Sequence, residues 1–123
     1  MRAYHVTERA RLPGLLARGF DPLSFWATRE RLVGYYAEDY AEPVVIEIDT
    51  DGLCPEAHGF DVDHPSIEEP ICGAIGMREE EVRNAWAAVA GPGTWRDCEA
   101  LVGSFLIRAA IPPDRLRVNS DLL

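Results

Sequence analysis

The chain has 123 residues, 47% of them hydrophobic, and its 12 basic residues face 21 acidic ones, for a net charge of −9. This size and apolar content predict a single domain, residues 1–123, that buries a core without disulfides or metals. The acidic balance disfavours binding to the phosphate backbone of nucleic acids. No stretch reaches the roughly 20 apolar residues that span a bilayer, and no signal-peptide pattern is visible, so we expect a cytoplasmic protein.

The first half of the chain alternates between strand and helix patterns. Pro13 suits the first turn of a helix, and Gly19 suits the left-handed residue that follows one. Thr28 is a typical N-cap residue, and the β-branched run after Pro43 is the clearest strand. In order, we predict a strand over Arg2–Val6, a helix from about Leu12 to Gly19, a strand over Leu23–Ala27, a helix over Arg29–Tyr40 and a strand over Val44–Ile48.

The second half begins with a long connection, Leu53–Gly76, which has little periodicity and is rich in Pro, Gly and acidic residues. A helix over Met77–Ala90 is predicted by an apolar stripe and by glutamates near its N-terminal end. A turn or short helix up to about Leu101 follows, and then strand. The segment Ile111–Val118 suggests a proline turn between strands. The complete pattern predicts an α+β domain.

The chain has three cysteines, Cys54, Cys72 and Cys98. They are odd in number and match no CxxC pattern, so we expect reduced thiols.

All 12 basic residues are arginines, and half of them lie in the first 31 residues. Guanidinium groups recognise phosphate oxygens in a bidentate manner. The early arginines therefore suit either a pyrophosphate or an ordinary solvated surface.

Four motifs follow one another in the N-terminal part of the chain. They are Tyr4-His5-Val6-Thr7, then Leu12-Pro13 with Leu15, Leu16 and Gly19, then Phe25-Trp26-Ala27-Thr28, and then a tyrosine-bearing helix. Their order resembles the ADP-ribosyltransferase-like superfamily in its His-Tyr-Glu branch, which includes poly(ADP-ribose) polymerases, RNA 2′-phosphotransferases and many small bacterial enzymes. The resemblance covers about residues 3–50.

The resemblance implies a split, mostly antiparallel β-sheet with short flanking helices. It also implies an NAD-dependent mono-ADP-ribosyltransferase that takes NAD as substrate, uses no metal and releases nicotinamide. The acceptor is unknown. The charge balance favours a protein over nucleic acid, which also argues against an RNA 2′-phosphotransferase, and no membrane partner is implied. Roles as a toxin, an anti-defence factor or a housekeeping modifier stay open.

The resemblance also implies roles for residues near the N-terminus. His5 would bond the adenosine-side ribose of NAD, the backbone of Val6 would pair with the nicotinamide amide, and Thr7 would line the same groove. Phe25 takes the position of the family's first tyrosine, although it lacks the hydroxyl. Tyr36, eleven positions later, would stack on nicotinamide, so His5 and Tyr36 should face each other across a cleft.

The third catalytic position of the family is a glutamate at the start of a late strand, and Glu99 is the candidate here. A fixed carboxylate near the ribose stabilises the oxocarbenium-like state that forms as nicotinamide leaves. If the segment around Glu99 is helical, this side chain would instead point outward as a surface carboxylate. Asp97 and Glu47 are further carboxylates to test.

Three other interpretations stay open. His5, Tyr35 and Tyr36 can be structural residues. Cys54, His58, Asp61, Asp63 and His64 could hold a divalent metal ion, although their spacing matches no established ligand pattern and a solvated acidic loop explains them as well. The domain could also be a non-enzymatic acidic interaction module, as inhibitors and immunity proteins are. Phe25 in place of tyrosine favours that reading.

Overall fold

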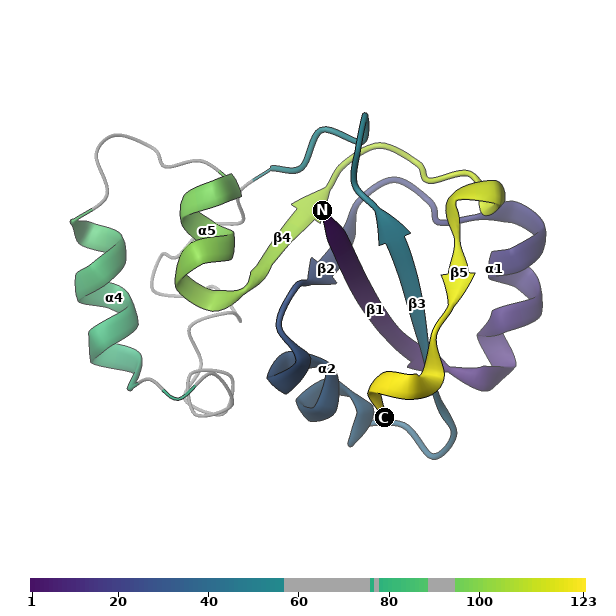
Figure 1. Cartoon of the computed structure of the whole chain (residues 1–123), viewed down its shortest axis with the longest axis horizontal. Coiled ribbons are helices and arrows are strands. Elements are labelled where there is room, and N and C mark those ends of the chain that lie inside the picture. Colours follow the sequence, from purple (N-terminus) through teal and green to yellow (C-terminus); the bar gives the residue numbers. More distant parts are fainter. Residues whose placement is uncertain (57–75, 77, 89–94) are drawn as a thin grey trace.

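The computed structural model describes residues 1–56, 76, 78–88 and 95–123, which build one five-stranded antiparallel sheet in the order β4-β2-β1-β3-β5, flanked by short helices (Figure 1). This confirms the expected α+β class with an antiparallel sheet. The strands are β1 (Arg2–Glu8), β2 (Ser24–Ala27), β3 (Pro43–Asp49), β4 (Ser104–Ile107) and β5 (Arg117–Val118). The α-helices are α1 (Leu12–Arg18), α2 (Glu30–Ala37), α4 (Glu79–Ala87) and α5 (Trp95–Val102), and the 3-10 turns are η1 (Arg9–Arg11), η3 (Pro113–Arg115) and η4 (Ser120–Leu122).

The centre of the sheet is the long antiparallel pair of β1 and β3. Seven residue pairs join them, from Arg2 opposite Asp49 to Glu8 opposite Pro43. The middle of β3, Val44 to Ile48, is buried on both faces of the sheet, which explains why this segment is apolar without alternation. The strand predicted over Val44–Ile48 is thus confirmed as part of β3, and all five of its residues are buried.

Side chains alternate between two separately covered faces of the sheet. One face carries Ala3 of β1 and Trp26 of β2, packed against residues of α1 and α5 such as Leu15 and Trp95. The other face carries Val6 of β1, packed against residues of α2 and η4. Each side chain of β1 therefore belongs to one of two distinct environments.

The strand and helix predictions are confirmed, with differences at helix ends. Helix α2 begins after Arg29, which occupies the N-cap position in an extended conformation without a side-chain cap bond. The hydroxyl of Thr28, the predicted cap, donates instead to Glu99 Oε1 at 2.8 Å. The helix ends at Ala37, because the amides of Asp39 and Tyr40 bond carbonyls only three residues back.

The C-terminal part also follows its sequence pattern. Helix α5 ends at Gly103, which has φ +74°, and β4 starts at the next residue. Cys54 is exposed and Cys98 is buried, and the two do not form a disulfide with each other. Most of the predicted connection Leu53–Gly76 lies outside the described residues, and so do Cys72 and the proposed metal ligands His58, Asp61, Asp63 and His64.

Strands β1 and β2 are neighbours over a very short distance. They share a single residue pair, Tyr4 opposite Ala27, whereas β2 and β4 share four pairs. Beyond Tyr4, strand β1 pairs with β3 alone, and β2 pairs with β4. The sheet is therefore nearly split between β1 and β2, and the side chain of His5, which bonds the Phe25 carbonyl, connects the two strands in place of backbone hydrogen bonds.

Gly19 offers a direct test of how the loop beside this gap is anchored. Its φ is +78°, and a Cβ there would overlap the carbonyl oxygen of Ile111. That carbonyl accepts the amide of Phe20 at 2.9 Å. We expect Gly19→Ala to lower the free energy of unfolding, measured in urea, by about 2–4 kcal/mol, because backbone strain and a steric clash add.

Gly52→Ala is the matched control, since Gly52 has the same φ of +78° but open space around the added Cβ. This variant should lose only the strain contribution, about 1 kcal/mol. Equal losses in the two variants would contradict the proposed anchoring of the loop by the Phe20–Ile111 contact.

Candidate functional site

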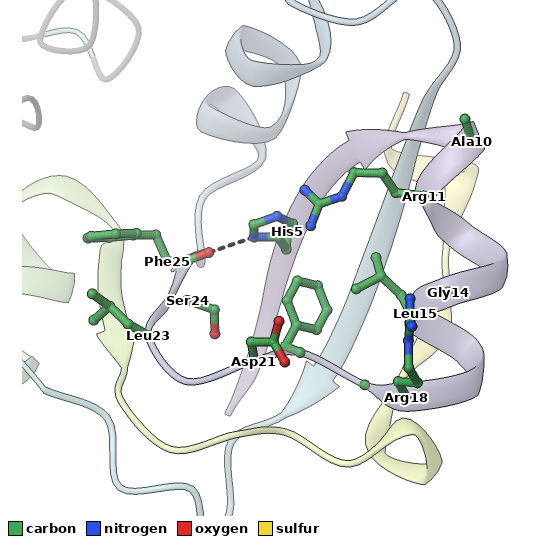
Figure 2. Close-up of a pocket in the computed structure, with 12 residues that line it drawn as sticks. His5, Ala10, Arg11, Gly14, Leu15, Arg18, Asp21, Leu23, Ser24 and Phe25 are labelled. Atoms are coloured by element: carbon green, nitrogen blue, oxygen red, sulfur yellow. Dashed lines mark hydrogen bonds between the residues drawn. The ribbon is translucent and has the colours of Figure 1, made fainter.

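A groove of about 800 Å³ lies where β1 and β2 part, between these strands and the helical segment η1–α1 (Figure 2). Ligand pockets commonly have volumes of about 300–1,000 Å³, so the groove is large enough for a nucleotide-sized molecule. The residues that line it are His5, Ala10, Arg11, Gly14, Leu15, Arg18, Gly19, Phe20, Asp21, Leu23, Ser24 and Phe25.

His5 lies at the split, between the two strands. Its Nδ1 is 2.8 Å from the carbonyl oxygen of Phe25, and its ring contacts the rings of Phe20 and Trp26 at centroid distances of 4.9 and 5.4 Å. Because a carbonyl can only accept, Nδ1 carries the hydrogen. In the neutral ring, Nε2 is then a hydrogen-bond acceptor.

The surroundings of His5 keep this ring neutral. Burial lowers the pKa of His5 below its usual value, and the positive charge of Arg11 lowers it further, although the hydrogen bond to Phe25 opposes them. His5 therefore offers an acceptor nitrogen, without a positive charge, at neutral pH.

The helical wall of the groove is positively charged. Arg11 points from η1 toward His5 (Figure 2), and its Nη1 is 3.4 Å from the Thr7 hydroxyl. Arg18 ends α1, and its guanidinium lies over Gly14, where a Cβ would come within 3.2 Å of it. Two cations thus line one wall of a groove in a strongly acidic protein.

The opposite wall is the loop Asp21–Ser24 with the start of β2. Leu23 and Phe25 are apolar yet about half exposed, 49% and 50%. Leu23 adopts φ +69°, which is strained for a bulky side chain. Its amide bonds the carbonyl of Arg108 at 2.9 Å. Strained backbone that is held by neighbouring contacts occurs often at functional sites.

Tyr36 does not lie in this groove. It packs with Val6, Val33 and Val45 on the α2 face of the sheet, whereas the His5 ring contacts Phe20 and Trp26 on the other face. Burial, with Tyr35 and Asp39 nearby, raises the pKa of Tyr36 above its usual value. The expectation that His5 and Tyr36 face each other across one cleft is therefore corrected: the sheet separates them.

Val6 and Thr7 are both buried, and they differ in orientation. The side chain of Val6 belongs to the same cluster as Tyr36. Thr7 directs its hydroxyl toward Arg11, beside the groove. Phe25 lines the groove and supplies the carbonyl that orients His5. Of the five predicted NAD-binding residues, the structure thus brings His5 and Phe25 together in one cavity.

Glu99 lies in α5 rather than at the start of a strand, and it accepts a hydrogen bond from Thr28. It lines a different cavity, of about 680 Å³, beside Thr50, Cys54 and Trp95. Glu47 is buried and satisfied structurally, since it bonds Arg2 at 3.3 Å and Asn119 at 2.8 Å. The three predicted catalytic residues are therefore far from forming one site: His5 lies in the groove, Tyr36 on the α2 face of the sheet and Glu99 in the second cavity.

Sequence reasoning missed part of the groove. Arg11 and Arg18 belong to the early run of arginines, so their composition gave a signal. Asp21 gave no functional signal, because an aspartate before proline in a Gly-Phe-Asp-Pro sequence is explained by the turn alone. Leu23 gave none either, because an apolar residue is expected at the start of a predicted strand. Their importance depends on the distant Ile111 and Arg108 carbonyls, which bond the same loop.

Comparisons of the chain with protein-family models, with curated proteins and with solved structures found no match. Within the described part of the chain, no helix is long and apolar enough to cross a bilayer. In the same ranges, no group of three or more His, Cys, Asp or Glu side chains is placed to hold a metal ion.

The half-buried imidazole of His5 gives a pH-dependent prediction. A His with a folded-state pKa below the unfolded value of about 6.5 binds its proton first in the unfolded state as pH falls. His5 should therefore reduce stability as pH drops below about 6.5 and have no effect above it. We expect the His5 ring resonances in NMR to titrate below pH 6.5, and a titration at or above 6.5 would contradict the described environment.

Arg11→Gln should raise this pKa slightly, because it removes a neighbouring positive charge. Arg18→Gln is the control. It also changes a groove arginine, but one whose charge does not shift His5, so the titration midpoint should stay unchanged.

Proposed function

We propose that the groove beside His5 binds NAD and that the protein is a mono-ADP-ribosyltransferase that releases nicotinamide. The observation that supports this best is the placement of an oriented, neutral imidazole on the floor of a groove with two arginines on its wall. The motif order of residues 3–50 supports the same function by resemblance, and the near split between β1 and β2 agrees with the sheet which that resemblance implies.

The arginines are suited to the pyrophosphate of NAD. Guanidinium groups form paired, charge-assisted hydrogen bonds with phosphate oxygens. Arg18 makes no ion pair or hydrogen bond among the described residues, so it is free to bind a ligand. Among the residues that the structure describes, the hydrogen-bond partner of Arg11 is the Thr7 hydroxyl, at a long 3.4 Å.

His5 and the aromatic side chains are suited to the nucleoside parts. With Nδ1 committed to the Phe25 carbonyl, Nε2 can accept a hydrogen bond from a ribose hydroxyl, the role that the resemblance gives to His5. The half-exposed Phe25, which lines the groove, provides apolar surface for a flat ring.

The proposed reaction is the transfer of ADP-ribose. The bond between the ribose C1′ and the nicotinamide nitrogen breaks, and nicotinamide leaves with the electron pair. The acceptor nucleophile forms a new bond to C1′ and loses a proton. The protein contributes by binding, orienting and stabilising the positive ribose. The net charge of −9 favours a protein acceptor over nucleic acid, and we propose a cytoplasmic location, where free thiols stay reduced.

A second candidate is a binding module without catalysis. The specific observation in its favour is that neither Tyr36 nor Glu99 reaches the groove. Such a module would bind NAD, or the charged group of a partner protein, and would leave the glycosidic bond intact.

Isothermal titration with NAD tests the binding step. We expect Arg18→Gln and Arg11→Gln each to weaken NAD binding by about 10-fold, as the loss of one exposed charge-assisted hydrogen bond predicts. Arg117→Gln, an exposed arginine on β5 outside the groove, is the matched control and should bind as the unaltered protein does. Absence of NAD binding, or equal effects in all three variants, would contradict the proposal.

Chromatographic detection of nicotinamide separates the two candidates. The transferase should release nicotinamide from NAD, either slowly to water or faster to a protein acceptor. Binding without any release over a day would support the non-catalytic module instead.

A further inference from the structure

We infer that Asp21 is the carboxylate that stabilises the nicotinamide-side ribose during transfer, with the pyrophosphate of NAD bound along α1. This inference rests on the proposed function and specifies its catalytic residue. The chemistry requires a fixed negative charge near C1′ as the oxocarbenium-like state forms. Glu99, the residue that the resemblance suggests, lines another cavity and bonds Thr28.

Asp21 is the single carboxylate among the twelve residues that line the groove. It lies in the loop that leads into β2, whereas Arg11 and Arg18 belong to the helical wall (Figure 2). Its side chain is exposed, and among the described residues it makes no ion pair. An acid that is free of local partners in a groove with two arginines is available to a ligand.

The backbone around Asp21 is held on both sides. Phe20 and Ile111 exchange two backbone hydrogen bonds, at 2.9 and 3.0 Å, and Leu23 donates to the carbonyl of Arg108 at 2.9 Å. Pro22, which lies between these two anchored residues, has its own φ fixed by the proline ring. The strained φ of Leu23 persists because these bonds fix the loop. The backbone that carries the Asp21 carboxylate is thus held in place before a ligand arrives, which favours electrostatic stabilisation by this group.

The distribution of charge in the groove also matches NAD. This substrate has a negative pyrophosphate and a positively charged nicotinamide ring. The arginines on the η1–α1 wall attract the pyrophosphate, and Asp21 on the loop wall attracts the nicotinamide ring. This charge complementarity orients NAD so that the bond between ribose and nicotinamide lies on the side of Asp21 and Phe25.

The test compares Asp21→Asn with Glu99→Gln, two changes that each replace a carboxylate by its amide. We expect Asp21→Asn to slow nicotinamide release by about 100-fold or more, as the removal of a preorganised charge-stabilising group does. Its Kd for NAD, measured by titration, should change by no more than about 3-fold. Glu99→Gln should release nicotinamide within about 3-fold of the unaltered rate. Asp21→Glu, which keeps the charge, should recover part of the lost rate.

The outcomes distinguish the inference from the proposed function. If the unaltered protein releases nicotinamide and Asp21→Asn does so at the same rate, Asp21 is not the carboxylate, although the function stands. Loss of release in Glu99→Gln alone would assign the role to Glu99 and overturn the inference. If the unaltered protein binds NAD but releases no nicotinamide, the transferase function fails, and the inference fails with it.

Discussion

The parting of β1 from β2 is the constraint on which the candidate site depends. The two strands share one residue pair, and the imidazole of His5 then bonds the Phe25 carbonyl at 2.8 Å in place of further ladder bonds. The carbonyl of Phe25 has no ladder partner on β1, and the imidazole supplies the donor that the ladder does not. The histidine thus satisfies the β2 backbone, and the separation of the strands leaves room for the groove.

The same arrangement gives the groove its chemical character. The loop from Gly19 to Ser24 returns from α1 to β2 and is fixed by backbone bonds to Ile111 and Arg108, residues far away in the sequence. One wall is therefore a helix end with arginines, and the other is a rigid loop with a carboxylate and exposed apolar groups. Such a combination suits a molecule with both charged and flat aromatic parts.

Much of the fold could be predicted from the sequence, because the signals were local. The apolar run of β3 specifies its strand, and Pro13 and Gly19 specify the two ends of α1. The site was predicted less well, since it depends on which face of the sheet each side chain occupies. Tyr36 has a fitting spacing from Phe25, but α2 packs it against Val6 and Val45. The catalytic role predicted for Glu99 required it to lie at the start of a strand, and the structure places it in helix α5.

A crystal structure of the protein with NAD would show whether the groove binds the dinucleotide. We expect density for NAD in the groove between η1–α1 and β2, with its pyrophosphate on Arg11 and Arg18 and a ribose hydroxyl on His5 Nε2. NAD bound beside Glu99 in the second cavity, or against Tyr36 on the α2 face, would contradict it.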